Sequence, residues 1–190
     1  MNKAFFWYSF KFLLFFAVLY SALQFYIGIT VPGGWYFPFF AKYLNIIEWY
    51  RDFMFFVAQK ILGLLNFQTE TNRYTLRIVG SNYIRMVWSC LGIGVQSFWF
   101  ALVLANAGKW AFKLKWLITG FVIVTACNIS RIVVIIIANN KKWLQHWKID
   151  HHDAYNIFVY GIIFLLIFVY KNALLKQEVA VKKVKQQVNA

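Results

Sequence analysis

The chain has 190 residues, of which 62% are hydrophobic and 22% aromatic, whereas only 14% are charged. Ordinary globular domains are about half apolar and a quarter charged, so this composition excludes a water-soluble globular domain and indicates an integral membrane protein. The formal net charge of +14 does not indicate a nucleic-acid partner. The lysines lie beside apolar runs and near the C-terminus, where positive charge marks the cytoplasmic side of a membrane and its anionic lipid headgroups.

The first long apolar run predicts a membrane-spanning helix over residues 12–29. About 18 apolar residues are just long enough to cross a bilayer about 30 Å thick, and Lys3 and Lys11 precede them. A cleavable signal peptide is the alternative, but no small-x-small cleavage site precedes Pro32 and aromatic residues crowd the end of the run. We therefore expect an uncleaved first span with its N-terminus in the cytoplasm.

Residues 39–65 have a helical pattern that is interrupted by charges. The charged residues in this segment are Lys42, Glu48, Arg51, Asp52 and Lys60. A charge at the centre of a membrane helix costs about 2.5–3.5 kcal/mol. The segment therefore predicts an amphipathic helix, or a helical hairpin, that lies in the membrane interface rather than a clean span.

Residues 66–88 change to the two-residue period of β-strands. Three large apolar residues alternate with their neighbours in one run (Tyr74, Leu76 and Ile78 with Thr75, Arg77 and Val79). After Gly80-Ser81-Asn82 the alternation resumes with Ile84, Met86 and Trp88. Two such runs around a Gly-Ser-Asn turn predict a β-hairpin in water. The hairpin leads directly to Cys90.

Three further apolar runs predict spans over residues 91–107, 116–138 and 154–170. The short loop between the first two holds three lysines and no acidic residue (Lys109, Lys113 and Lys115), which indicates the cytoplasmic side. We expect an all-α membrane protein with about four transmembrane helices, an interfacial amphipathic helix and a small extracytoplasmic β-hairpin. Residues 1–172 would form a single integral membrane domain, and residues 173–190 a basic cytoplasmic tail, disordered or lying on the inner leaflet.

This topology brings three reactive residue types to the extracytoplasmic surface. Cys90 opens the second span, and His152 immediately precedes the fourth. Arg131 lies seven residues inside the outer end of the third span, about 11 Å deep at 1.5 Å per residue. A thiol, an imidazole and a guanidinium are thus expected at one surface.

The spacing of polar residues supports the same grouping. Thr125, Asn128 and Arg131 recur every three residues on the third span. His152, Asn156 and Tyr160 recur every four on the fourth. Polar faces of membrane helices normally face one another, because lipid cannot satisfy them, so we expect these two stripes to meet near Cys90.

A thiol, a histidine and an arginine together suit acyl transfer. A neighbouring cation lowers the pKa of a thiol and raises the fraction of reactive thiolate. Histidine accepts the thiol proton and returns it to a leaving amine, and arginine stabilises a thiolate or an oxyanion. The chemistry predicted is attack on a peptide carbonyl, formation of a thioester, and its release to water or an amine.

Other interpretations stay open at this point. Cys90 alone is more often a packing residue, Arg131 alone could extend to the interface, and Cys127 is expected to be a packing residue with no disulfide to Cys90. A metal or haem site would use His146, His151 and His152. A non-enzymatic four-span assembly or transport subunit would need the polar stripes only to hold its helices together.

Three motifs in this order resemble those of the exosortase/archaeosortase family of membrane cysteine transpeptidases. They are Ser-Cys90-Leu-Gly92-Ile-Gly after the hairpin, Asn128-Ile-Ser-Arg131-Ile in the third span, and His152-Asp153-Ala-Tyr-Asn156 before the fourth. The similarity covers roughly residues 66–170. His152 rather than His151 matches the motif, because Asp153 follows it directly.

The resemblance implies that Cys90 is the nucleophile, His152 the acid and base, and Arg131 the stabilising cation. Gly92, Asn128, Asp153 and Asn156 would then have supporting or substrate-binding roles. It also implies a protein of the bacterial cytoplasmic membrane that needs no cofactor or metal, whose site faces outward. The expected partners are membrane lipid and the C-terminal sorting signal of an exported protein, with the acyl acceptor left open.

Overall fold

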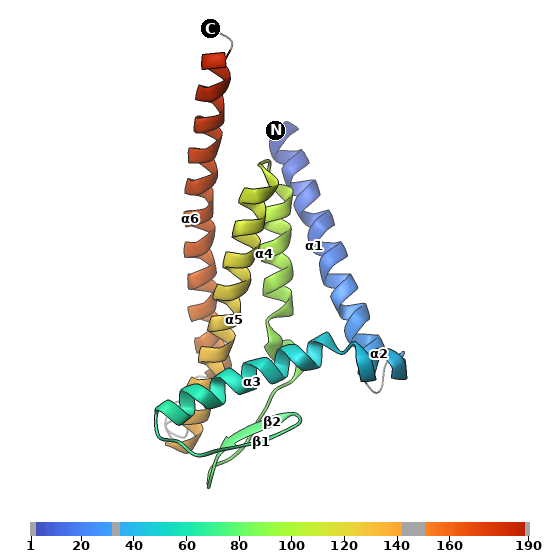
Figure 1. Cartoon of the computed structure of the whole chain (residues 1–190), viewed down its shortest axis with the longest axis vertical. Helices are drawn as coiled ribbons and strands as arrows, with labels where there is room; N and C mark the ends of the chain where they lie inside the picture. The colour runs from blue at the N-terminus through green and yellow to red at the C-terminus, as the bar shows by residue number, and fades with distance from the viewer. Residues whose placement is uncertain (1–2, 32–34, 142–150, 189–190) are drawn as a thin grey trace.

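The computed structural model describes residues 3–31, 35–141 and 151–188, and this part of the chain is mostly helical (Figure 1). Its helices are α1 (Lys3–Thr30), α2 (Pro38–Tyr43), α3 (Ile46–Leu64), α4 (Ile93–Ala105), α5 (Trp110–Asn140) and α6 (His151–Val188). Its strands are β1 (Thr69–Asn72), β2 (Thr75–Ile78) and β3 (Ile84–Arg85). A short 3-10 turn, η1 (Trp88–Leu91), joins the sheet to α4. The predicted helical class is confirmed.

Four helices run along the length of the molecule in the packing order α1, α4, α5, α6 (Figure 1). Of the described helices, α1, α5 and α6 are long and apolar enough to cross a membrane. The second predicted span corresponds to α4, which has only 13 residues, or about 20 Å at 1.5 Å per residue. It is shorter than predicted because η1 and Gly92 occupy its expected first turn and Asn106 ends it.

Helix α3 runs across the end of this bundle, beside the sheet (Figure 1). We call this the sheet end; both chain termini lie at the opposite end. The side of α3 that packs on the protein buries Met54, Phe55 and Leu62, whereas Trp49 and Phe53 are exposed. Neither α2 nor α3 is among the candidate spans. The segment predicted as an amphipathic helix or a hairpin is therefore a short and a long helix in series.

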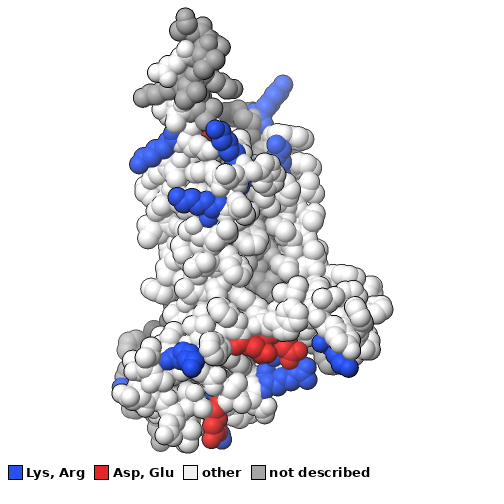
Figure 2. Space-filling view, viewed as in Figure 1, with Lys and Arg blue, Asp and Glu red and all other residues white. Residues whose placement is uncertain are grey.

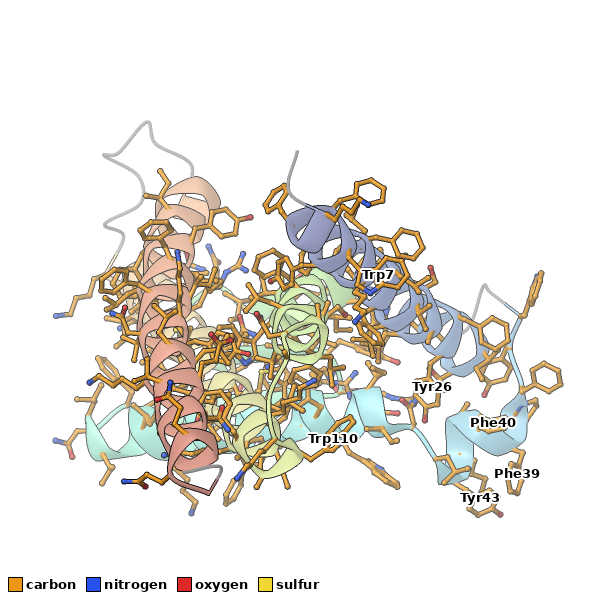
Figure 3. The ribbon with its side chains drawn as sticks, turned by 90° about the horizontal axis from the view of Figure 1, so that it is seen from above. Trp7, Tyr26, Phe39, Phe40, Tyr43 and Trp110 are labelled. Carbon is orange, nitrogen blue, oxygen red and sulfur yellow. The ribbon has the colours of Figure 1, made fainter. Side chains whose placement is uncertain are left out.

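The junction between α2 and α3 is held by two polar side chains. Asn45 caps α3, because its Oδ1 accepts a hydrogen bond from the Glu48 backbone N–H at 3.0 Å. The Tyr26 hydroxyl of α1 donates to the Leu44 carbonyl. Phe39 and Tyr43 of α2 point away from the bundle (Figure 3) and are exposed.

The sheet has the order β1-β2-β3, with both pairs antiparallel. The predicted pairing around Gly80-Ser81-Asn82 corresponds to β2 and β3, in the register Leu76 opposite Ile84. The structure adds β1, which the prediction missed. Its sequence Thr-Glu-Thr-Asn has no apolar alternation. It pairs with β2 in an antiparallel ladder, to which an exposed ion pair between Glu70 and Arg77 is added. The β3 strand is shorter than expected because its partner β2 begins at Thr75, opposite Arg85, so the ladder ends there.

One hydrophobic core joins the sheet, α3 and the adjoining half of α5. Leu76 of β2, Leu91 of η1 and Ile136 of α5 are almost fully buried in it. This core fixes the segment before α4 against α5. On the face drawn in Figure 2, a broad band without charged side chains separates the lysines near the termini from mixed charges at the sheet end.

Helix α6 continues to Val188, well past the predicted end of the fourth span at residue 170. The prediction of a disordered tail over residues 173–190 is wrong for residues 173–188, which are helical, and their place on the inner leaflet stays a prediction. Alanine, leucine, lysine, glutamine and glutamate fill most of this segment, and it holds no glycine or proline. These residues have high helix propensity, so the polar character that ended the predicted span does not end the helix.

Candidate active site

Cys90 lies in η1, a tight turn held at both ends. Its backbone N–H donates to the Val87 carbonyl at 2.9 Å, and the next residue, Leu91, is 1% exposed and anchored in the core. Cys90 itself is half-buried, with a free thiol. The turn therefore presents the thiol at the protein surface on a fixed backbone.

Gly92 and Asn128 clamp this turn against α5. The Asn128 side chain is buried, and its Nδ2 donates to the Leu91 carbonyl at 3.1 Å. Gly92 has a φ of +71°, and a Cβ built on it would lie 2.3 Å from Asn128 Nδ2. A positive φ favours glycine, and the close approach leaves no room for a side chain. Both residues, predicted as supporting ones, are thus positioned to hold the cysteine turn.

Cys90, Asn128 and Arg131 line one pocket of about 180 Å³. Arg131 lies on α5 nine residues before its end at Asn140, about 14 Å along the helix. The remaining lining residues are Ile84, Arg85, Met86, Ile132, Ile135 and Asn139. The structure therefore brings the predicted thiol and guanidinium to the same cavity, from elements that are separate in the sequence.

The predicted histidine lies at the start of α6. Helix α5 ends and α6 begins at the sheet end of the molecule (Figure 1), which is also where the pocket lies. The side chains of His152, Asp153 and Asn156 fall outside the described part of the structure. The approach of His152 to Cys90 therefore stays a prediction.

Two members of the predicted polar stripes lie elsewhere. Thr125 is buried away from the pocket, and its hydroxyl is 2.8 Å from the Tyr50 hydroxyl of α3. Tyr160 is 61% exposed, so the expectation that the whole α6 stripe faces α5 is wrong at this position. The face of α6 that packs on α5 carries Val159 and Ile163, which meet Cys127. Cys127 is a buried packing residue, as predicted.

Two polar lining residues, Arg85 and Asn139, are not predicted from the sequence. Arg85 occupies a polar position of the alternating strand pattern. Such a pattern predicts that the side chain is exposed, but not that it lies near Cys90. Among the nine lining residues, Arg85 and Arg131 carry positive charge and none carries a carboxylate. The pocket is therefore cationic by composition.

A second polar cluster ties the sheet to α3. Glu48 accepts hydrogen bonds from Arg73 Nε at 2.7 Å and from Arg51 Nη2 at 3.0 Å. Arg51 is 1% exposed and lies over the Tyr74 ring. The hydrogen bond from Arg73, and then that from Arg51, lower the pKa of Glu48 despite its partial burial. The same contact raises the pKa of Arg73. This cluster fixes the β1–β2 turn, and with it the strand that leads to Cys90.

Within the described residues, no group of three or more histidine, cysteine or acidic side chains is placed to hold a metal ion. His146 and the side chains of His151 and His152 lie outside that part of the chain. Comparison with protein-family models, with curated protein sequences and with solved structures finds no match to this chain.

Proposed function

We propose that the chain is a membrane-embedded cysteine peptidase or transpeptidase of the exosortase type. The observation that carries the proposal is the shared pocket: Cys90 and Arg131 line one cavity, and Asn128 holds the cysteine turn beside it. These three residues belong to the cysteine motif and the arginine motif, the two motifs whose side chains at these positions the structure describes. Chance explains the position of any one of these residues more easily than it explains the presence of all three at one cavity.

The proposed reaction follows from these residue types. His152 takes the proton of the Cys90 thiol, and the thiolate attacks a peptide carbonyl carbon to form a C–S bond. Arg131 stabilises the oxyanion that develops on the carbonyl oxygen. The C–N bond then breaks, the leaving amine takes the proton from His152, and a thioester remains. Water or an amine attacks the thioester, the C–S bond breaks, and the thiol is restored.

Helix periodicity favours His152 over His151 as the acid and base. Position 152 is seven residues, about two turns, before Val159. Val159 belongs to the face of α6 that packs on α5. Position 151 is rotated by about 100° from position 152. The helix backbone thus supports the same choice as the motif does.

Charge supports an orientation with the sheet end outside the cytoplasm. Lys109, Lys113 and Lys115 lie at the end of the molecule that carries both termini, with no acidic residue in their loop. At the sheet end the arginines are instead mixed with acidic residues, among them Glu48 and Glu70. Positive residues concentrate on the cytoplasmic side of membrane proteins. The pocket would then open outside the bacterial cytoplasmic membrane, where exported proteins with a C-terminal sorting signal present their hydrophobic helix.

The decisive test compares surface proteins from cells with the wild-type chain and from cells with Cys90→Ala, Arg131→Ala or His152→Ala. Mass spectrometry of protein C-termini should show at least one exported protein that loses a C-terminal hydrophobic segment only with the wild-type chain. Each substitution should abolish this processing, or reduce it by about two orders of magnitude or more.

Cys127→Ala is the matched control, because Cys127 is buried in packing contacts and lies outside the pocket. It should retain processing at equal protein level. Processing at a normal rate in the Cys90→Ala protein would overturn the mechanism.

A further inference from the structure

The strand β3 has one edge paired with β2 and one edge that faces away from the sheet. In the described part of the chain, β3 is the last strand of the order β1-β2-β3. Met86 N–H donates to the Tyr74 carbonyl at 3.0 Å, and Thr75 lies opposite Arg85. Hydrogen-bonded and non-hydrogen-bonded pairs alternate in antiparallel strands, so Arg85 is in a non-hydrogen-bonded pair. Its backbone N–H and C=O therefore point to the outer edge.

This outer edge borders the pocket of the candidate active site. Ile84, Arg85 and Met86 line the same cavity as Cys90 and Arg131. From Met86 the chain continues through η1 to Cys90 within four residues. No described strand pairs with this edge of β3. An unpaired strand edge is a ready template for another extended chain, and this one leads to the proposed nucleophile.

We propose that the substrate binds as an added β-strand along β3, with its scissile carbonyl at Cys90. The proposal deepens the function proposed above and rests on it. Recognition through main-chain hydrogen bonds at an exposed strand edge is an established way for a domain to hold an extended peptide. In this protein, such pairing would hold several substrate residues on the acyl side of the cleaved bond against β3.

The direction of the two chains indicates parallel pairing. β3 runs from the sheet towards α4 and the helix bundle, and a substrate whose exported part precedes a hydrophobic helix runs the same way. In a parallel pair, one residue bonds two different residues of its partner. Arg85 N–H would donate to one substrate carbonyl, and Arg85 C=O would accept from an amide two residues further on. The described lining residues include two arginines and no carboxylate, which suits a neutral or acidic peptide rather than a basic one.

The test uses the full chain in detergent and a peptide that alkylates thiols, acetyl-Ala-Ala-Ala-chloromethyl ketone. Cys90 Sγ forms a bond to the methylene carbon of the probe, the C–Cl bond of that carbon breaks, and chloride leaves. Iodoacetamide serves as a thiol reagent without a peptide. Intact mass and peptide mapping give both labelling rates at Cys90, and their ratio measures peptide recognition alone.

Arg85→Pro removes the outward N–H, whereas the inward Met86 N–H stays, and proline is tolerated at strand edges. Arg85→Ala changes the side chain but keeps both backbone groups and is the matched control. We expect the rate ratio in Arg85→Pro to fall about three- to tenfold below that in Arg85→Ala, as for the loss of one hydrogen bond. A second set of probes, each N-methylated at a different amide, is tested on the wild-type protein. Methylation of the one amide that donates to the Arg85 carbonyl should slow labelling of Cys90, whereas methylation of the neighbouring amides should not.

The methylated probes keep the test decisive if Arg85→Pro does not fold. Equal ratios for all probes, or labelling by iodoacetamide without labelling by any peptide, would overturn strand addition and leave the proposed function standing. Failure of both reagents to modify Cys90 would overturn the nucleophile assignment and this inference with it.

Discussion

Gly92 is the residue whose replacement is expected to disturb the candidate site most directly. Gly92→Ala places a methyl group 2.3 Å from Asn128 Nδ2 and requires a residue with a side chain at φ +71°. Backbone strain of this kind costs about 1–3 kcal/mol, and the contact adds to it. We expect a lower thermal unfolding midpoint in detergent and slower alkylation of Cys90. Tryptophan fluorescence and mass spectrometry measure these effects.

Gly161→Ala is the control for this substitution. Gly161 lies within α6 and a Cβ there meets nothing within 4 Å, so alanine should be neutral or stabilise the helix by up to about 1 kcal/mol. A Gly92→Ala protein as stable as the Gly161→Ala protein would show that the clamp on the cysteine turn is misjudged.

Asn128 should be coupled energetically to Gly92. Asn128→Ala leaves the Leu91 carbonyl without its donor, at a cost of about 1–3 kcal/mol, but it also removes the atoms that Gly92→Ala would strike. Gly92→Ala should therefore lower the unfolding midpoint less in the Asn128→Ala protein than in the wild type, because the effects of substitutions at contacting residues are not additive. Strictly additive shifts in a double-mutant cycle would contradict the contact.

Cys90, Asn128 and Arg131 could be predicted as a group because helix spacing and motif order are properties of sequence. The contribution of Arg85 and Asn139 could not, because pocket lining depends on how β3 approaches α5 in space. Strand alternation placed Arg85 on a polar face, yet that pattern carries no information about which helix end lies opposite.

At the level of elements, Glu48 fixes the β1–β2 turn on α3. It bonds Arg51, Arg73 and the Asn45 side chain, and Arg51 is buried. Glu48→Gln should therefore destabilise the protein by about 1–3 kcal/mol, typical for hydrogen bonds to charged groups. Glu70→Gln, which breaks only the exposed pair with Arg77, should cost at most about 1 kcal/mol. Thermal unfolding at neutral pH compares the two.

The effect of Glu48 should depend on pH in a defined direction. The pKa of Glu48 is lowered from its ordinary 4.5 in the folded protein, mainly by the hydrogen bond from Arg73. Its ionised form therefore stabilises the fold fully above about pH 4.5, and this contribution is lost as the pH falls through the folded pKa. The gap in unfolding midpoint between wild type and Glu48→Gln should be constant from pH 6 to 8 and shrink below about pH 4.5. A gap that widens on acidification would refute the ion-pair assignment.

Elements with strong periodicity could be predicted from the sequence, and those without it could not. The apolar runs located α1, α5 and α6, and the alternation located β2 and β3. β1 lacks alternation and is held by pairing with β2, a tertiary effect. The segment 173–188 of α6 cannot be predicted from hydropathy, because a polar composition ends the apolar surface of a helix but not the helix itself.

For the whole molecule, the central prediction is that the sheet end lies outside the cytoplasm. Alkaline phosphatase, which is active only after export, should be active when inserted after Asn72 in the β1–β2 turn. Green fluorescent protein fused after Val188 should fluoresce, because in this topology that end stays in the cytoplasm. The opposite pattern for both reporters would invert the topology and place the pocket inside.

The same two reporters fused after Gly108 test whether α4 crosses the membrane. If it does, despite its 13 residues, green fluorescent protein should fluoresce there and alkaline phosphatase should be inactive. Active phosphatase at this position would show that α4 is not a span. Composition predicted a membrane protein with helical spans, but span number depends on where η1 and Gly92 start α4, which hydropathy does not report.

The length of α6 has a mechanical consequence. Its apolar stretch covers Ile157–Ala180, and the helix continues to Val188, about 12 Å further at 1.5 Å per residue. A fluorophore on that last turn would sit on a stiff rod rather than on a loose tether. Its distance from a dye in the lipid headgroups should therefore vary little, and energy transfer between the two should show a narrow distribution that broadens when Glu178→Pro interrupts the rod.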